Sequence, residues 1–178
     1  MTMKVVVAVC GSVAAVRTPE LVRELIRQGF DVECIMSPEA QRIIHPNVLH
    51  WASGKPVVTE LTGAVEHVRL LGVDSEADLL LICPSTSNTI SKIACGIDDT
   101  VITTMAATAL GAKKPVIIVP AMHISMYKNP FVAENIKKLK KAGVKFVGPR
   151  FEEDKAKIAE EKEIIAEVKK ALKRNGRE

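Results

Sequence analysis

The sequence predicts a three-layer α/β protein built around a mainly parallel, doubly wound sheet. One observation is a set of unbroken apolar runs, such as residues 79–83, bounded by turn residues. Such short runs are typical of strands that are buried on both faces. The second observation is that these runs alternate along the chain with segments of helical periodicity, the pattern of parallel sheets covered by helices.

The first part of the chain predicts two strands joined by a helix. Residues 4–10 and 31–36 are the β-branched, apolar strands. The helix between them covers residues 13–28, or begins near Thr18 with Pro19 in its first turn, and it ends before Gly29.

The region after the second strand predicts one short helix and an irregular segment. Ser37 supplies a helix cap, Pro38 suits the first helical position and Glu39 places an acid in the first turn, so a helix should run to about Ile44. Residues 45–63 are expected to be less regular, because two prolines and a glycine interrupt them.

The second half of the chain continues the alternation of strands and helices. The predicted strands are 79–83, 115–120 and 144–147, and the predicted helices are 89–95, 100–110, 129–141 and 155–173. The last helix is charged and amphipathic, and its apolar stripe consists of Ile158, Ile164, Ile165, Val168 and Leu172.

The length and composition favour a single globular domain. The chain has 178 residues, of which 47% are hydrophobic and 26% charged, as in soluble proteins. It contains no internal repeat and no linker long enough for a second domain. We therefore expect one domain over residues 1–178, with residues 151–178 forming a C-terminal helix or a partly free arm.

Composition also argues against several classes of partner. Aromatic residues make up 3% of the chain, too few for stacking platforms that bind single-stranded nucleic acid. Much of the net charge of +4 lies in residues 137–145 and near the C-terminus, where solvated helix faces explain it better than a nucleic-acid patch. No apolar run is long enough to cross a membrane, and the first ten residues lack the features of a signal peptide.

The four cysteines are scattered and form no Cys-x-x-Cys pair. They are Cys10, Cys34, Cys83 and Cys95. Three of them lie in or at the end of strand-like runs. We therefore expect buried free thiols in a cytoplasmic protein, with neither disulfides nor a metal site.

A run of small polar residues follows the predicted strand at 79–83. Pro84 ends that strand, and four hydrogen-bonding residues come next: Ser85, Thr86, Ser87 and Asn88. Hydroxyls and free backbone N–H groups between a strand's carboxyl end and a helix's amino end can bind an anion. The alternative is an ordinary helix cap, which needs only one such residue.

Three more loops should meet at the same crevice, because the carboxyl ends of parallel strands share one edge of the sheet. They contain Gly11 and Ser12, Ser37, and residues 121–123. None carries a dinucleotide fingerprint or a P-loop lysine, so a mononucleotide or a smaller phosphate is the better interpretation. Gly11 permits close backbone approach to a ligand or serves a plain strand–helix turn.

Two histidines are candidates for acid–base chemistry. His67 lies among apolar residues, where a lone histidine is more often structural than catalytic. His123 lies in a loop where a ligand is expected. His45 and His50 have no partner pattern, and we interpret them as structural.

Four motifs together resemble the homo-oligomeric flavin-containing Cys decarboxylase family. They are Gly-Ser-Val-Ala-Ala at 11–15, His-Val-x-Leu at 67–70, Pro-Ser-Thr-Ser-Asn-Thr at 84–89 and Pro-Ala-Met-His-x-x-Met-Tyr-x-Asn-Pro at 120–130. Within that family the chain is most similar to the decarboxylase halves of archaeal bifunctional phosphopantothenoylcysteine decarboxylase/phosphopantothenate–cysteine ligases. The resemblance covers about residues 4–149.

The resemblance implies a flavodoxin-like fold, bound FMN and a homotrimer or homododecamer with active sites at subunit contacts. It implies decarboxylation of 4′-phosphopantothenoylcysteine to 4′-phosphopantetheine in coenzyme A synthesis, and a ligase domain or protein as a possible partner. The FMN-binding positions would be Gly11, Ser12, Val13, Ser37, Ser85, Thr86, Ser87 and Asn88. His67 and His123 would be catalytic, and the substrate-binding positions would be Ala121, Met122, His123, Met126 and Asn129.

The sequence departs from the family pattern at two places in the chain. His123 stands where the family usually has an asparagine that meets the substrate carboxylate, and a histidine can donate to a carboxylate too. The segment after Gly148-Pro149 lacks the cysteine that, in bacterial members, protonates the enethiolate during the final reduction. Either another donor, such as Lys155 or Lys157, replaces it, or the final reduction proceeds in another way. An alternative function on the same fold is an electron-carrying flavoprotein or a flavin reductase, which would not need the 120–130 segment.

Overall fold

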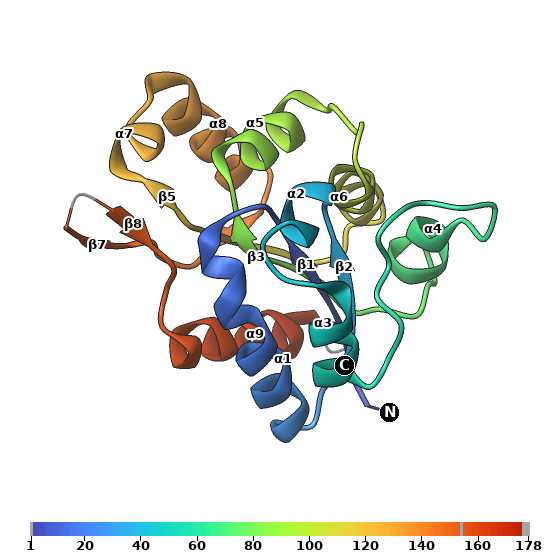
Figure 1. The fold of residues 1–178 in the computed structure, drawn as a ribbon. Coiled ribbons are helices and arrows are strands. Elements are labelled where there is room, and N and C mark those ends of the chain that lie inside the picture. The colour runs from blue at the N-terminus through green and yellow to red at the C-terminus, as the bar shows by residue number, and fades with distance from the viewer. Residues whose placement is uncertain (1, 154, 176–178) are drawn as a thin grey trace.

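A computed structural model describes residues 2–153 and 155–175, and its centre is a five-stranded parallel sheet (Figure 1). The strands are β1 (Lys4–Val9), β2 (Asp31–Met36), β3 (Leu79–Ser85), β4 (Val116–Pro120) and β6 (Lys145–Phe146). They are ordered β2-β1-β3-β4-β6, and every pair is parallel. Counted within this sheet the order is 2-1-3-4-5, which is the flavodoxin-like arrangement, so the predicted fold class is confirmed.

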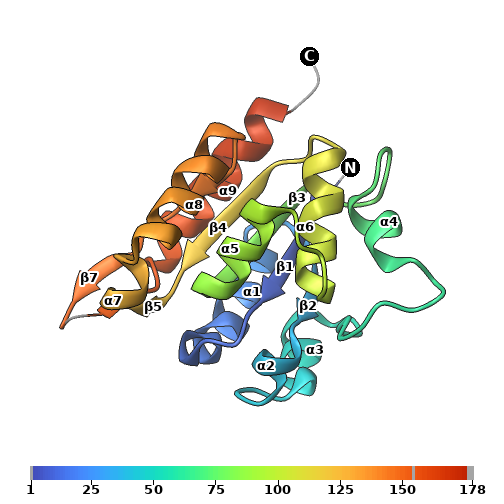
Figure 2. The ribbon, with the colours of Figure 1, turned by 90° about the horizontal axis from the view of Figure 1, so that it is seen from above.

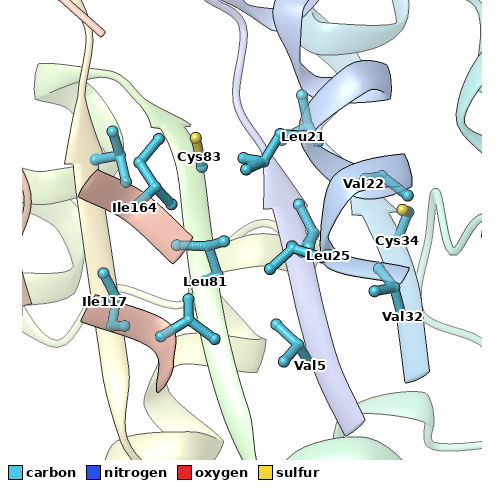
Figure 3. Packing of buried hydrophobic residues seen from close by; sticks show 14 of the residues in the cluster. Val5, Leu21, Val22, Leu25, Val32, Cys34, Leu81, Cys83, Ile117 and Ile164 are labelled. Atoms are coloured by element: carbon cyan, nitrogen blue, oxygen red, sulfur yellow. The ribbon is translucent and has the colours of Figure 1, made fainter. Parts of the chain in front are cut away.

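One face of the sheet is covered by three helices and a 3₁₀ turn. These are η1 (Val13–Arg17), α1 (Thr18–Arg27), α3 (Pro46–Ser53) and α9 (Glu161–Asn175). Figure 3 shows the packing: Val5 of β1, Leu81 of β3 and Ile117 of β4 meet Leu25 of α1 and Ile164 of α9. Because its apolar stripe is buried in this cluster, α9 is an integral part of the layer rather than a free arm.

The other face is covered by α4 (Glu66–Leu71), α5 (Ser87–Cys95), α6 (Val101–Gly111) and α8 (Pro130–Lys141). The side chains of β1 alternate between the two faces, so Val6 and Ala8 belong to this second cluster. Figure 2 shows α5, α6 and α8 side by side along the sheet. Helices on both faces explain why the strand runs are apolar throughout. No helix among the described residues has the length and apolar character needed to cross a membrane.

Two predicted helices and one segment predicted to be irregular differ from the observed structure. The stretch 13–28 divides into η1 and α1, with Pro19 in the first turn of α1, and the helix after Ser37 is only α2 (Pro38–Gln41). The irregular segment 45–63 contains α3, which begins with Pro46 and ends at Gly54 with φ of 73°. The alternative start near Thr18 is thus confirmed, whereas Pro46, which was interpreted as an interruption, marks a helix start.

The predicted helix over 155–173 also begins later than expected. Residues Lys155–Lys157 form β8, and α9 starts at Glu161. A second, three-stranded antiparallel sheet pairs β8 with β5 (Met122–His123) and β7 (Arg150–Glu152). The sequence indicated neither β5 nor this pairing, because strands of two or three residues carry no readable period. The short helix α7 (Ile124–Tyr127) follows β5 directly.

Candidate ligand-binding site

The polar stretch 85–88 joins β3 to α5 and has more hydrogen-bonding groups than a helix cap uses. Strand β3 continues through Pro84 to Ser85, so the prediction that Pro84 ends the strand is wrong. Thr86 caps α5, because its side chain accepts from the backbone N–H of Thr89 at 3.3 Å. Ser85 is fully buried, and its hydroxyl has no hydrogen-bond partner among the described residues. A buried hydroxyl without a partner is costly, so its presence favours a ligand that completes it. Ser87 is buried and Asn88 is exposed beside it.

Ser12 and Ser37 lie at the carboxyl ends of β1 and β2, at the same edge of the sheet. Ser37 is buried and accepts from the backbone N–H of Ala40 at 3.1 Å. Ser12 accepts from Ala14 at 3.4 Å, a long contact that leaves its hydroxyl available. Both residues were predicted from the sequence to lie here, and the topology brings them to the edge that also carries Ser85.

Gly11 has a structural reason that does not involve a ligand. A Cβ added at Gly11 would lie 2.4 Å from Cβ of Glu39, the second residue of α2. No pair of carbon atoms tolerates that separation. Glycine is therefore needed for the β1 loop to pack against α2, and a contact between Gly11 and a ligand stays a prediction.

A cleft of about 550 Å³ opens beside the β1 loop, between η1, β5 and β8. Its lining residues are Ser12, Val13, Ala14, Val16, Arg17, Ala121, Met122, His123, Lys155, Ala156, Lys157 and Ile158. Val13 is 77% exposed and Val16 is 57% exposed. Exposed aliphatic side chains in a cleft indicate a binding surface for an apolar group.

The rim of this cleft is basic. Arg17, His123, Lys155 and Lys157 all line it. Lys157 donates to Glu152 at 2.8 Å, whereas no hydrogen bond or ion pair joins the side chain of Lys155 to the rest of the described chain. Lys155 lies directly opposite His123 in the β5–β8 ladder. The cleft therefore suits a ligand with an apolar body and an anionic group.

His123 caps α7 through its ring. Its Nδ1 accepts from the backbone N–H of Ser125 at 3.2 Å, so in the neutral ring the proton is on Nε2. His123 thus has one N–H to donate. Asn129 caps α8 in a similar way, with its side-chain oxygen accepting from Phe131 at 2.9 Å. Met126 is half-exposed on α7, near the same segment.

His67 does not join this cleft. It lies on α4, and Figures 1 and 2 both place α4 on the opposite side of the molecule from β5 and α7. Its Nδ1 is buried and has no hydrogen-bond partner among the described residues. Within one chain, the two histidines predicted to be catalytic therefore lie in different places.

The buried thiols are poor nucleophiles. Burial raises the pKa of Cys10 to about 11 and that of Cys34 to about 12, and it raises the pKa of Cys83 as well. All four cysteines are free, as expected, but Cys95 is exposed at the end of α5. Because a thiolate is the reactive form, Cys10 beside the β3 loop is inert at neutral pH.

Sequence reasoning missed the η1 wall of the cleft. Ala14, Val16 and Arg17 lie within the stretch predicted to be helical. The signal that could have separated them from α1 is Pro19, which lies in the first turn of that helix. Ile158 was assigned to an apolar helix stripe but follows β8 and lines the cleft.

Comparisons with known proteins match this geometry. The profile of the Flavoprotein family fits residues 1–173. The chain belongs to the Flavoprotein family. Solved structures with the same fold include that of the FMN-dependent cysteine decarboxylase SpaF, with a TM-score of 0.85, 27% identity and coverage of 98% of both chains.

Two curated relatives differ in length, one being much longer than this chain and the other similar to it. It is 56% identical over 170 residues to the coenzyme A biosynthesis bifunctional protein CoaBC of Thermococcus kodakarensis, covering 95% of this chain and 42% of that protein. It is 34% identical to the probable phosphopantothenoylcysteine decarboxylase of Streptococcus mutans, covering 84% of each. The chain therefore spans about two fifths of the bifunctional relative and most of the shorter one.

Proposed function

We propose that the protein binds FMN and decarboxylates 4′-phosphopantothenoylcysteine to 4′-phosphopantetheine, a step of coenzyme A synthesis. The observation that carries the proposal is that one edge of a flavodoxin-like sheet carries both a basic, apolar cleft and the buried Ser85 hydroxyl, which has no hydrogen-bond partner among the described residues. The names of the Thermococcus and Streptococcus relatives support the substrate, and the likeness to the FMN-dependent SpaF supports the cofactor.

The residues at the sheet edge fit FMN. Hydroxyls and backbone N–H groups from Ser12, Ser37 and residues 85–88 would hold its phosphate and ribityl chain. The exposed aliphatic side chains of Val13 and Val16 would meet the flavin ring. When bound, FMN would supply reversible two-electron chemistry, as an acceptor of electrons from the cysteinyl group and, after loss of CO₂, as the donor that returns them, so that the overall reaction is redox-neutral.

The segment 121–129 would bind the substrate beside the flavin. His123 would donate its Nε2 hydrogen to the substrate carboxylate, because its Nδ1 is already used by Ser125. Ala121 and Met122 line the same cleft, and Met126 and Asn129 extend the segment. Since the caps fix α7 and α8, the segment would present these side chains without first having to order them.

Of the two lysines, Lys155 is the better candidate for the proton donor that replaces the cysteine of bacterial members. Lys155 and Lys157 both line the cleft, but Lys157 is held by Glu152. Lys155 lies opposite His123 and is available to donate a proton to the decarboxylated product. Lys155→Met should therefore reduce formation of the final product more than Lys157→Met does.

His67 would act in the cleft of a neighbouring subunit. It lies on the far side of the chain from His123, and its buried Nδ1 lacks a partner among the described residues. We therefore propose a homotrimer, or a homododecamer that is built from such trimers, in which α4 of one subunit completes the site of the next. A ligase domain or a separate ligase protein would supply the substrate, and the bifunctional name of the longer relatives supports a second activity beside this one.

Complementation between subunits tests this assembly. Activity should be lost in the His67→Asn variant and in the His123→Leu variant, and it should partly return when the two are refolded together. Because such a mixture contains sites with both native histidines, recovery supports a shared site. Mixed assemblies with no recovery would contradict it. His50→Asn, which changes an exposed residue of α3, is the matched control and should retain activity.

The cofactor assignment has its own test. Purified protein should carry a yellow chromophore, or take one up on reconstitution, that mass spectrometry identifies as FMN and not FAD. A protein that binds no FMN would overturn the proposed function. FMN binding without decarboxylation of the substrate would favour an electron carrier or a flavin reductase.

A further inference from the structure

Four charged side chains form a closed ring at the amino edge of the sheet, away from the cleft. Arg69 of α4 contacts Glu33 of β2 at 2.6 Å and Glu76 at 3.2 Å. Lys4 of β1 contacts Glu76 at 2.6 Å and Glu33 at 3.6 Å. Charges of opposite sign thus alternate around the ring, which joins two strands, one helix and the turn before β3.

Ion pairing in the ring favours the charged forms of Arg69, Glu76 and Lys4. The hydrogen bond to Glu33 raises the pKa of Arg69, and the hydrogen bond from Lys4 lowers the pKa of Glu76. Burial disfavours the charged form of Lys4, but its hydrogen bond to Glu76 and the nearby carboxylates raise its pKa overall. Glu33 is only 7% exposed. A buried carboxylate needs both cations, because losing one leaves an uncompensated charge.

The helix that the ring holds has few other anchors. α4 has six residues, too few for a stable isolated helix. Leu70 and Leu71 are its buried side chains, and they pack in the cluster that contains α6. Val65 and Val68 are about half-exposed. The apolar contacts therefore fix only the end of α4, and Arg69 adds a second, directional attachment there.

His67 lies two residues before Arg69, so the placement of α4 decides where its imidazole lies. Surface ion pairs contribute little to stability, and a buried pair is often replaceable by apolar residues. The ring joins four segments of the chain. Its role is therefore better explained by the fixed position that it gives α4 than by a gain in the free energy of unfolding. Gly72 supports this tight geometry, because a Cβ there would lie 2.6 Å from the carbonyl oxygen of Val68.

We infer that Arg69, anchored by Glu33, is a positioning residue that sets the location of the His67 imidazole. Arg69 lies on the helix that carries His67, contacts a buried carboxylate on a core strand, and is tied to the turn that follows α4. The consequence for catalysis rests on the proposed function, in which His67 transfers a proton. The consequence for structure does not depend on it.

The test compares imidazole NMR signals of the intact protein at one pH. The chain has four histidines, and His67→Asn identifies the signal of His67 by its disappearance. In Arg69→Met, which keeps the aliphatic stem, the His67 signal should move while those of His45, His50 and His123 stay. Arg69→Lys should shift it less. Glu33→Gln keeps nearly the same side-chain shape and should also shift the His67 signal. It replaces Arg69→Met in the test if that variant fails to fold.

Arg27→Met is the matched control. Arg27 also bridges two glutamates, Glu20 at 3.0 Å and Glu24 at 2.9 Å, but it does so on the exposed side of α1. Its replacement should leave the His67 signal unchanged. An unchanged His67 signal in folded Arg69→Met or Glu33→Gln would overturn the inference, as would an equal shift in Arg27→Met.

Turnover gives a second readout. Misplacing an acid–base group slightly can cost on the order of 10²-fold, so Arg69→Met should lower kcat by about that factor with FMN affinity and KM unchanged. Arg69→Lys should recover part of the loss. If wild-type protein does not decarboxylate the substrate, the proposed function fails, while the NMR comparison still decides the positioning role.

Discussion

Replacing His123 separates two tasks that one side chain performs. Its Nδ1 accepts from Ser125 N–H at 3.2 Å to cap α7, and its Nε2–H is available to the substrate carboxylate. His123→Asn should preserve both, because asparagine is a favourable N-cap and its amide donates. His123→Leu should lose both.

The two losses have different magnitudes. Removing an N-cap costs about 0.5–2 kcal/mol, and since α7 is a single turn we expect about 1 kcal/mol or less here. For a chain of this size that is a fall of about 2–4 °C or less in Tm. Losing a hydrogen bond to a charged group costs about 1.5–3 kcal/mol, which is about 10–100-fold in kcat/KM.

Thermal unfolding and steady-state decarboxylation measure the two effects, with FMN content determined for each variant. The expected order of kcat/KM is wild type, then His123→Asn close to it, then His123→Leu far below. Equal damage from asparagine and leucine would refute the reasoning, because it would mean that imidazole chemistry is required at this position. Full activity in His123→Leu would show that His123 does not bind the substrate carboxylate.

Three further predictions concern other parts of the chain. Ser85→Ala should weaken FMN binding without lowering the free energy of unfolding, since it removes a buried hydroxyl that lacks a partner among the described residues; fluorescence titration with FMN and urea unfolding check this, and unchanged affinity would count against the site. Gly11→Ala should destabilise the protein by about 1–3 kcal/mol, because its Cβ would collide with Glu39, and a neutral result in urea unfolding would contradict that contact. Hydrogen bonds from Thr62 hold the pKa of Glu66 at about 2, so its stabilising contribution is complete above about pH 4.5 and is lost as the pH falls toward 2. Glu66→Gln should therefore show a flatter stability profile in that range, and an identical acid profile would argue against the Thr62–Glu66 contact.

The layered fold was predictable because its signals are local. Strands buried on both faces read as apolar runs, and 79–83 and 115–120 gave the positions of β3 and β4 closely. Helix α8 begins at Pro130 and ends at Lys141, as the cap at Asn129 indicated. The gathering of serines at one sheet edge followed from parallel topology alone.

The remaining parts of the candidate site depend on contacts between distant segments. The pairing of β5 with β8 places Lys155 opposite His123, but neither strand is long enough to show a period. The position of α4 depends on the ring around Arg69, which joins residues up to 72 positions apart. Sequence could therefore nominate His67 but could not show that it lies away from the cleft.

Decarboxylation of the proposed substrate is the most direct test of the account. Purified protein reconstituted with FMN would be incubated with 4′-phosphopantothenoylcysteine, while released CO₂ and the mass of the product are followed. We expect equimolar CO₂ and a product with the mass of 4′-phosphopantetheine. Both should be abolished in His67→Asn, although that variant retains FMN. FMN-loaded wild-type protein that leaves the substrate unchanged would contradict it.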